Sequence, residues 1–135
     1  MKGEIEKMDE RTMYWINLAE YDIDTAAAML ETKRFLYVGF MCHQAIEKAI
    51  KAVLSTMPEV KIPKVHNLIK LAEMAGIFDT MTDQQKKVLF VLNPLNIESR
   101  YPSYKETLLA QLTAERCEKI ITDTKEMFTW IKTLL

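Results

Sequence analysis

The stretch from Phe35 to Leu54 limits the fold of this chain more than any other segment. It contains no proline and a single glycine, so it predicts one long helix in which Gly39 lets a neighbouring element approach closely. Small and aliphatic residues recur at helical spacing along one face, which predicts the side that packs into a core. The residues of this predicted core side are Val38, Cys42, Ile46, Ala49, Ile50 and Val53.

The opposite face of the same helix is unusual, because a solvated face would be dominated by charged residues. It carries aromatic, thioether and amide groups, and it is therefore predicted to contact a partner helix, a second copy of the chain or a ligand. We call it the mixed face, and its residues are Tyr37, Phe40, Met41, Gln44 and Lys48. The alternative is that the polar residues here, with Glu47 and Lys51, form only a solvated face.

The composition predicts a single domain spanning residues 1–135. The net charge of the chain does not indicate a particular class of binding partner, such as nucleic acid. With only 3 glycines and 4 prolines, the chain has few of the turn residues that an all-β fold needs. Its 18 basic and 19 acidic residues give no overall positive charge to hold nucleic acid, so only a local basic patch could do so.

No apolar run approaches the roughly 18 residues of a transmembrane helix. The charged N-terminal residues lack a secretory signal, so a cytoplasmic location is expected.

Periodicity and capping signals predict helices throughout the chain. Thr82 and Gln85 form a capping-box pattern, Gly76 is placed to cap a short helix in the left-handed conformation, and the prolines at 58 and 63 predict an extended linker. Pro102 predicts that a helix ends near Arg100. The expected fold is all-α, an up-and-down antiparallel bundle of four main helices plus a short extra helix. The predicted helices span residues 10–32, 34–57, 66–75, about 83–93 and 113–132.

The first and last predicted helices each carry an apolar stripe. In the last helix it comprises Cys117, Ile120, Ile121, Thr124, Met127, Phe128 and Ile131. In the first helix it comprises Trp15, Leu18, Ala19, Ile23, Ala26, Met29 and Leu30, and Asp22 falls among them. A buried carboxylate without a partner costs several kcal/mol, so Asp22 should be paired, and the candidates are His43, Lys48 or Arg100. It is either a structural pair or a carboxylate of a functional site.

Neither the cysteines nor the histidines indicate a metal or cofactor site. Cys42 and Cys117 lie among apolar helical neighbours and are interpreted as buried free thiols. His43 and His66 have no metal-ligand spacing, and neither a Cys-x-x-Cys pair nor a glycine-rich phosphate loop occurs. We therefore expect no metal and no cofactor, and a structural role for both histidines, with His66 capping the short helix.

The segment from Ile97 to Lys105 combines polar and aromatic residues at a predicted helix end. Arg100 offers a planar fork for phosphate, and Tyr101 and Tyr104 offer faces on which a base could stack. The segment is either a phosphate or nucleotide contact or a rigid loop whose arginine caps carbonyls or pairs with an acid.

Four stretches in order along the chain resemble the HEPN family of small helical domains. They run from Trp15 to Asp22 with Ala26 following, from His43 to Ala52, from His66 to Leu71, and from Arg100 to Pro102. The resemblance implies a bundle of four main helices, a homodimer with a site near the dimer cleft, and, for many single-domain relatives, a minimal nucleotidyltransferase as partner in a toxin–antitoxin pair.

Several branches of that family are metal-independent RNases that use an arginine, four to six intervening residues and then a histidine. Arg100 could fill the first role, but Lys105, Glu106 and Thr107 stand where the histidine should be. An imidazole would supply proton transfer or phosphate stabilisation in that chemistry. The departure from the motif argues against catalysis.

The leading hypothesis is a non-catalytic HEPN protein that binds a nucleotide or RNA phosphate in a dimer cleft, docks a nucleotidyltransferase, or does both. Arg100 would contact phosphate, Tyr101 or Tyr104 would stack, Asp22 would orient the arginine, and Lys48 is a further phosphate contact. One alternative is an RNase in which His43 or His66 substitutes for the missing histidine. Another is a pure protein-interaction subunit that uses the mixed face.

Overall fold

The first helix of the structure begins at a cap that the sequence supplies. The structure is a computed structural model that describes residues 8–96 and 102–135. Asp9 accepts a hydrogen bond from the backbone of Arg11 at 2.8 Å and starts helix α2. Within the described ranges every regular element is helical, which confirms the all-α prediction. The α-helices are α2 (Glu10–Glu31), α3 (Phe35–Ser55), α4 (Leu68–Met74), α5 (Asp83–Leu92), α6 (Pro102–Gln111) and α7 (Ala114–Lys132), and the 3-10 turns are η1 (Phe78–Thr80) and η2 (Asn93–Leu95).

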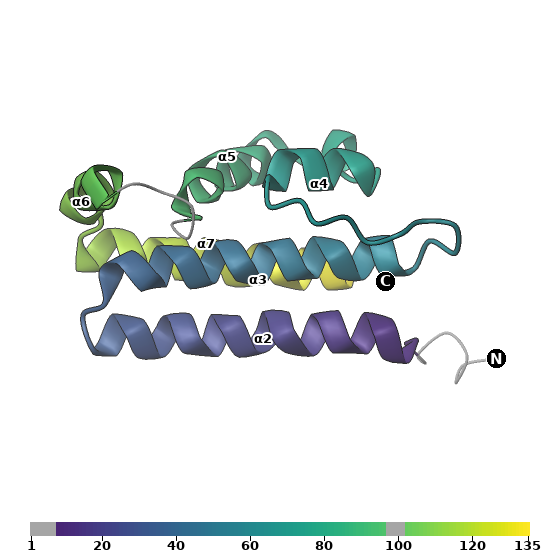
Figure 1. The fold of residues 1–135 in the computed structure, drawn as a ribbon, viewed down its shortest axis with the longest axis horizontal. Helices are drawn as coiled ribbons and strands as arrows, with labels where there is room; N and C mark the ends of the chain where they lie inside the picture. The colour runs from purple at the N-terminus through teal and green to yellow at the C-terminus, as the bar shows by residue number, and fades with distance from the viewer. Residues whose placement is uncertain (1–7, 97–101) are drawn as a thin grey trace.

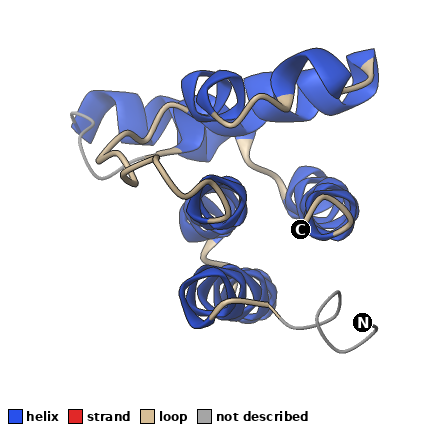
Figure 2. Cartoon of the chain, turned by 90° about the vertical axis from the view of Figure 1, so that its right-hand side faces the viewer, coloured by secondary structure: helices blue, strands red, loops and turns tan. Residues whose placement is uncertain are grey.

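Helix α3 lies at the centre of the bundle. Figure 1 shows α2 running antiparallel beside α3, with α7 behind α3 and the shorter helices α4, α5 and α6 laid across its other edge. Figure 2 shows helices on three sides of α3, and on the fourth side no described helix covers it. The chain passes from α3 through the α4–α6 layer before α7, so α7 runs in the same direction as α3.

This central position buries more of α3 than its apolar face alone. All six residues of the predicted core side are buried, as expected. Buried positions also extend around the helix to His43, Glu47 and Lys51, because the α4–α6 layer covers that side. Gly39 lies directly under η2: a Cβ atom built on it would meet Leu95 Cδ1 at 3.1 Å, which confirms the predicted close approach.

The outer helices follow the predicted stripes with one shift. All seven stripe residues of α7 are buried. In α2 the stripe is centred on Ile16, which the sequence interpretation missed, while Trp15 and Leu18 are only partly buried. Asp22 is buried with the stripe, as predicted. Cys42 and Cys117 are buried free thiols, which also confirms the prediction.

Most helix ends confirm the capping signals. Thr82 and Gln85 form the predicted capping box, and Gly76 closes α4 with a φ of 72°. The prediction that His66 caps α4 is wrong, because Asn67 is the N-cap and accepts from the backbone of Lys70 at 3.0 Å. Helix α6 begins at Pro102, a favourable first position for proline, and the expected helix end near Arg100 lies outside the described residues. No described helix is long and apolar enough to cross a membrane.

Candidate functional site

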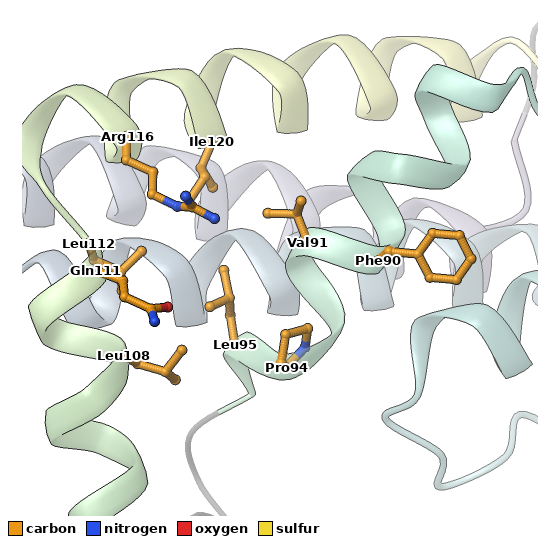
Figure 3. Close-up of a pocket in the computed structure, with 9 residues that line it drawn as sticks. All are labelled: Phe90, Val91, Pro94, Leu95, Leu108, Gln111, Leu112, Arg116 and Ile120. Carbon is orange, nitrogen blue, oxygen red and sulfur yellow. The ribbon is translucent and has the colours of Figure 1, made fainter.

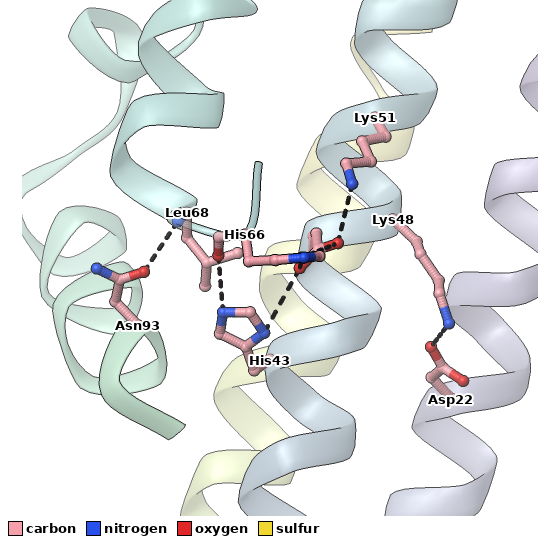
Figure 4. Close-up of polar contacts among 8 residues, drawn as sticks. Asp22, His43, Lys48, Lys51, His66, Leu68 and Asn93 are labelled. Atoms are coloured by element: carbon pink, nitrogen blue, oxygen red, sulfur yellow. Dashed lines mark hydrogen bonds and ion pairs between the residues drawn. The ribbon is translucent and has the colours of Figure 1, made fainter. Parts of the chain in front are cut away.

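Asp22 is paired with Lys48, one of its three predicted partners. Lys48 Nζ donates to Asp22 Oδ2 at 2.5 Å, and this pair joins α3 to α2 (Figure 4). The Asp22 side chain is only 7% exposed, whereas Lys48 is 23% exposed. The carboxylate is therefore buried but satisfied, and water reaches its partner. His43 is engaged elsewhere, and Arg100 lies outside the described residues.

A second polar cluster is centred on Glu47, one residue before Lys48 on α3. Lys51 Nζ donates to Glu47 Oε2 at 2.9 Å, and His66 Nδ1 lies 3.0 Å from Glu47 Oε1. The Lys51 ammonium also lies 5.8 Å from the ring centroid of Trp15 on α2. We call His43, Glu47, Lys51 and His66 the Glu47 cluster; it ties α3 to the segment that leads into α4 (Figure 4).

His43 is held neutral inside this cluster. Its Nε2 lies 3.0 Å from the carbonyl oxygen of His66, which can only accept, so Nε2 carries the proton. Burial lowers the pKa of His43 below its ordinary value of 6.5, although Glu47 and the His66 carbonyl act in the opposite direction. Nδ1 has no hydrogen-bond partner and lies 3.9 Å from Glu47 Oε1. The ring therefore acts as a buried donor that fixes the backbone at His66.

His66 differs from His43 in its exposure. Its side chain is 61% exposed while Nδ1 faces the buried carboxylate of Glu47. A carboxylate on one ring nitrogen fixes the orientation of an imidazole and leaves the other nitrogen for solvent or a ligand. His66 is thus the more accessible of the two imidazoles in this chain.

The sequence interpretation did not single out the Glu47 cluster. The alternative of a purely solvated face is wrong for Glu47 and Lys51, which are buried within the chain. A signal was present, because His43, Glu47 and Lys51 follow one another at four-residue spacing and so lie on one side of a helix. Its partner, His66, was not recognisable from spacing, since 19 residues separate it from Glu47.

The mixed face is exposed at Tyr37 and mostly covered along the rest of its length. Tyr37 is 49% exposed and packs edge-on against Phe40, with ring centroids 6.4 Å apart. Phe40 itself is 8% exposed, while Met41 and Gln44 are partly buried. Gln44 Oε1 is buried, and the Gln44 side chain interacts with the neighbouring His43, where it acts to raise the pKa of the imidazole.

Of the remaining predicted site residues, the structure describes Tyr104, which lies in α6. Tyr104 is partly buried, and its hydroxyl donates to the carbonyl of Pro94 at 3.4 Å. Arg100 and Tyr101 fall within residues 97–101 and lie outside the described residues. Of the predicted site residues that the structure describes, Asp22 and Lys48 therefore contact each other, and Tyr104 contacts Pro94.

The described residues offer limited chemistry. Residues 8–96 and 102–135 contain no group of three or more histidine, cysteine, aspartate or glutamate side chains able to hold a metal ion. The two lysines of the clusters face two carboxylates, so their charges are matched within the chain. Burial raises the pKa of the Cys42 thiol to about 12, which leaves it without nucleophilic character.

The fold and the sequence place the chain in a known class. The family model of the HEPN domain matches residues 12–134, so the chain belongs to the HEPN family. A comparison with curated proteins found no match.

Two solved structures share this fold at low sequence identity. A crystal structure of TT1696 from Thermus thermophilus superposes with a TM-score of 0.80 at 17% identity, covering 94% of this chain and all of that one. The crystal structure of ST0689, an archaeal HEPN homologue, gives 0.68 at 18% identity, covering 93% of this chain and 98% of that one. Both similarities establish the fold.

Proposed function

We propose that this HEPN protein is a non-catalytic module that acts by association. It would form a homodimer, bind a nucleotide or RNA phosphate in the dimer cleft, and pair with a nucleotidyltransferase in a toxin–antitoxin-like system. One observation carries the absence of catalysis: the chain has two histidines, and neither follows Arg100 in the sequence. His43 bonds to the backbone carbonyl of His66, and the His66 ring contacts Glu47. Lys105, Glu106 and Thr107 offer no imidazole in their place.

The mixed face supports the association part of the proposal. It contains a half-exposed tyrosine, Tyr37, which packs edge-on against Phe40 beside the partly buried Met41 and Gln44. Aromatic and methionine side chains are enriched where protein surfaces meet a partner. We therefore propose that Tyr37, Phe40, Met41 and Gln44 contribute to an interface.

The phosphate contact is assigned to Arg100, with Tyr101 or Tyr104 stacking on a base. Lys48 is the second proposed contact, and its pairing with Asp22 means that a phosphate would have to share this lysine with a carboxylate. Asp22 would thereby position Lys48, and its proposed orientation of Arg100 stays a prediction. On this basis Arg100 would carry more of the binding than Lys48.

The first test combines RNA binding and RNA cleavage without added metal. Purified wild type and Arg100→Ala are titrated into a labelled RNA oligonucleotide by fluorescence anisotropy, and the same mixtures are run on a gel. We expect binding without cleavage, and about tenfold weaker binding by the variant, because a charge-assisted contact to phosphate is lost. Arg11→Ala is the matched control, and circular dichroism checks that both variants fold. Unchanged binding by Arg100→Ala would remove Arg100 from the site.

A second candidate function is an RNase with a substituted histidine, and one observation favours it. The Glu47–His66 contact presents an oriented imidazole whose side chain is largely exposed. If the wild type cleaves RNA, His66→Ala should abolish the cleavage while His43→Gln retains it. Cleavage that survives His66→Ala would exclude this imidazole.

A third candidate is a pure interaction subunit without a ligand. The matched charges of the two polar clusters favour it, because a neutral network attracts phosphate weakly. A dimer in solution that is lost in Tyr37→Asp, together with no binding of RNA or nucleotide by the wild type, would support this function over the first.

A further inference from the structure

We propose that the pocket enclosed by α5, η2, α6 and α7 binds a small carboxylic acid with an apolar chain. The chain of the ligand would lie against aliphatic side chains, and its carboxylate would pair with Arg116. The pocket has a volume of about 220 Å³. This proposal does not depend on the mixed face or on Arg100, so it can be tested independently of the proposed function.

The walls of the pocket come from four elements and are mostly aliphatic. Leu95, Leu108, Leu112 and Ile120 line it and are themselves nearly buried, while Val91 is 41% exposed at its edge. Figure 3 shows Leu95 and Leu112 facing the centre of the pocket, and Phe90 turned away from it. Walls of this kind, supplied by packed elements, bury an apolar ligand at little cost of rearrangement.

Leu95 is fixed in place by the element beneath it. It packs directly on Gly39 of α3, where an added Cβ would come within 3.1 Å of its side chain. The pocket floor is therefore set by the close approach of η2 to α3. A preformed floor favours binding, because little conformational freedom is lost when a ligand enters.

Arg116 supplies the charge at this site. Its backbone N–H donates to Thr113 Oγ1 at 3.1 Å, which fixes the root of the side chain in the first turn of α7. Figure 3 shows the guanidinium extending from α7 over the pocket, and within the described residues it makes no ion pair. A planar guanidinium matches a carboxylate with two parallel hydrogen bonds, and the nearby amide of Gln111 adds a donor.

The size and lining of the pocket exclude larger ligands. Its volume is below the range of about 300–1,000 Å³ typical of drug-sized ligands, so a nucleotide would not be enclosed. Among the described residues that line the pocket, Phe90 is the aromatic one, and it is turned away and offers no stacking face inside. A short aliphatic acid satisfies both the walls and the unpaired cation.

The test titrates hexanoate into the isotopically labelled protein and follows backbone amide shifts by NMR. We expect saturable shifts at Gln111, Leu112 and Ile120, with binding weakened about tenfold or more in Arg116→Gln, because a charge-assisted hydrogen bond is lost. Arg116→Lys should recover part of the affinity, since it restores charge but not the fork. Arg11→Gln is the matched control and should bind as the wild type does. Hexanol should bind the wild type and Arg116→Gln equally.

Val91→Trp provides an independent check at the pocket edge, where the side chain is exposed enough for the fold to tolerate it. It should reduce hexanoate binding while leaving the thermal unfolding midpoint unchanged. Absence of saturable shifts in the wild type, or equal affinity in Arg116→Gln, would overturn the proposal. A second titration compares an acetylated peptide that ends in leucine with the same peptide carrying a C-terminal amide. If the free-acid peptide shifts the same backbone amides at concentrations tenfold below those of hexanoate, the pocket binds the C-terminus of a protein chain. The small-acid assignment would then be wrong.

Discussion

The two polar clusters of α3 each pair a lysine with a carboxylate but differ in how they are built. Asp22 and Lys48 form a simple pair between α2 and α3, and the lysine keeps part of its side chain in water. Glu47 instead accepts from Lys51 and His66, lies 3.9 Å from His43, and is almost completely enclosed. The first cluster can exchange its partner for water or a ligand. The Glu47 cluster is buried and holds the segment before α4 against α3.

This contrast bears on which charges are available for function. Lys48 belongs to the mixed face and is partly exposed to solvent, whereas Lys51 is buried against Glu47 and Trp15. Consecutive turns of one helix thus carry a structural lysine and an accessible one. The difference comes from the layers on either side of α3, and three experiments test it.

The largest effect is expected when the acceptor of the Glu47 cluster is removed. Glu47→Ala leaves the buried Lys51 without its carboxylate and should lower the free energy of unfolding by about 3–5 kcal/mol, the usual cost of breaking a buried ion pair. Urea denaturation followed by circular dichroism measures this change. Glu118→Ala, at an exposed position of α7, is the control and should cost little. A loss below about 1 kcal/mol for Glu47→Ala would mean that the Glu47 cluster contributes no more to stability than a surface ion pair. The two clusters would then not differ in their contribution to the free energy of unfolding.

A smaller effect is expected at the other cluster. Lys48→Met keeps the apolar stem but leaves Asp22 without its partner, and the free energy of unfolding should fall by about 1–3 kcal/mol, because water can reach the carboxylate through the space that the ammonium left. The double variant Asp22→Asn with Lys48→Met should be more stable than Lys48→Met alone, since no charge is then stranded. Both are measured by the same urea denaturation. A loss in the free energy of unfolding equal to that of Glu47→Ala would show that the two clusters contribute equally to the stability of the fold.

The smallest effect is a pH dependence that arises from His43. Burial lowers the pKa of His43 in the folded state, so the unfolded chain takes up a proton first as the pH falls through the ordinary value of 6.5. The stability contributed by neutral His43 is therefore present above pH 6.5 and is lost progressively below it, with a slope of at most about 1.4 kcal/mol per pH unit. Urea denaturation between pH 7.5 and 5.5 measures the slope. His43→Gln should flatten it relative to the wild type; equal slopes in the wild type and His43→Gln would show that other groups carry it.

Much of the fold was predictable because it depends on local rules. The stripe of α7, the capping box at Thr82 and the glycine cap at Gly76 are set by residues within a turn or two of one another. The shift of the α2 stripe to Ile16 was not predictable, because the face that a helix buries depends on where α3 and α7 meet it.

The candidate site was predicted less completely for the same reason. Asp22 was recognised as a buried acid from its neighbours, but three partners were open until the folded chain placed Lys48 beside it. The contact between His66 and Glu47 could not be predicted, because the path of the linker after α3 brings them together. The pocket beside Arg116 combines four elements, none of which shows a pattern for it alone.

The sequence by itself determined that the chain is helical, where most helices begin and end, and which residues of α3 and α7 enter a core. These outcomes follow from backbone hydrogen bonding, capping and the burial of apolar stripes, which act over short distances along the chain. Only the tertiary structure decided that Glu47 and Lys51 are buried while Lys48 is not, and that Arg116 lies over an apolar pocket. Those outcomes depend on which elements cover a given side of a helix, and long-range packing rather than local pattern sets that arrangement.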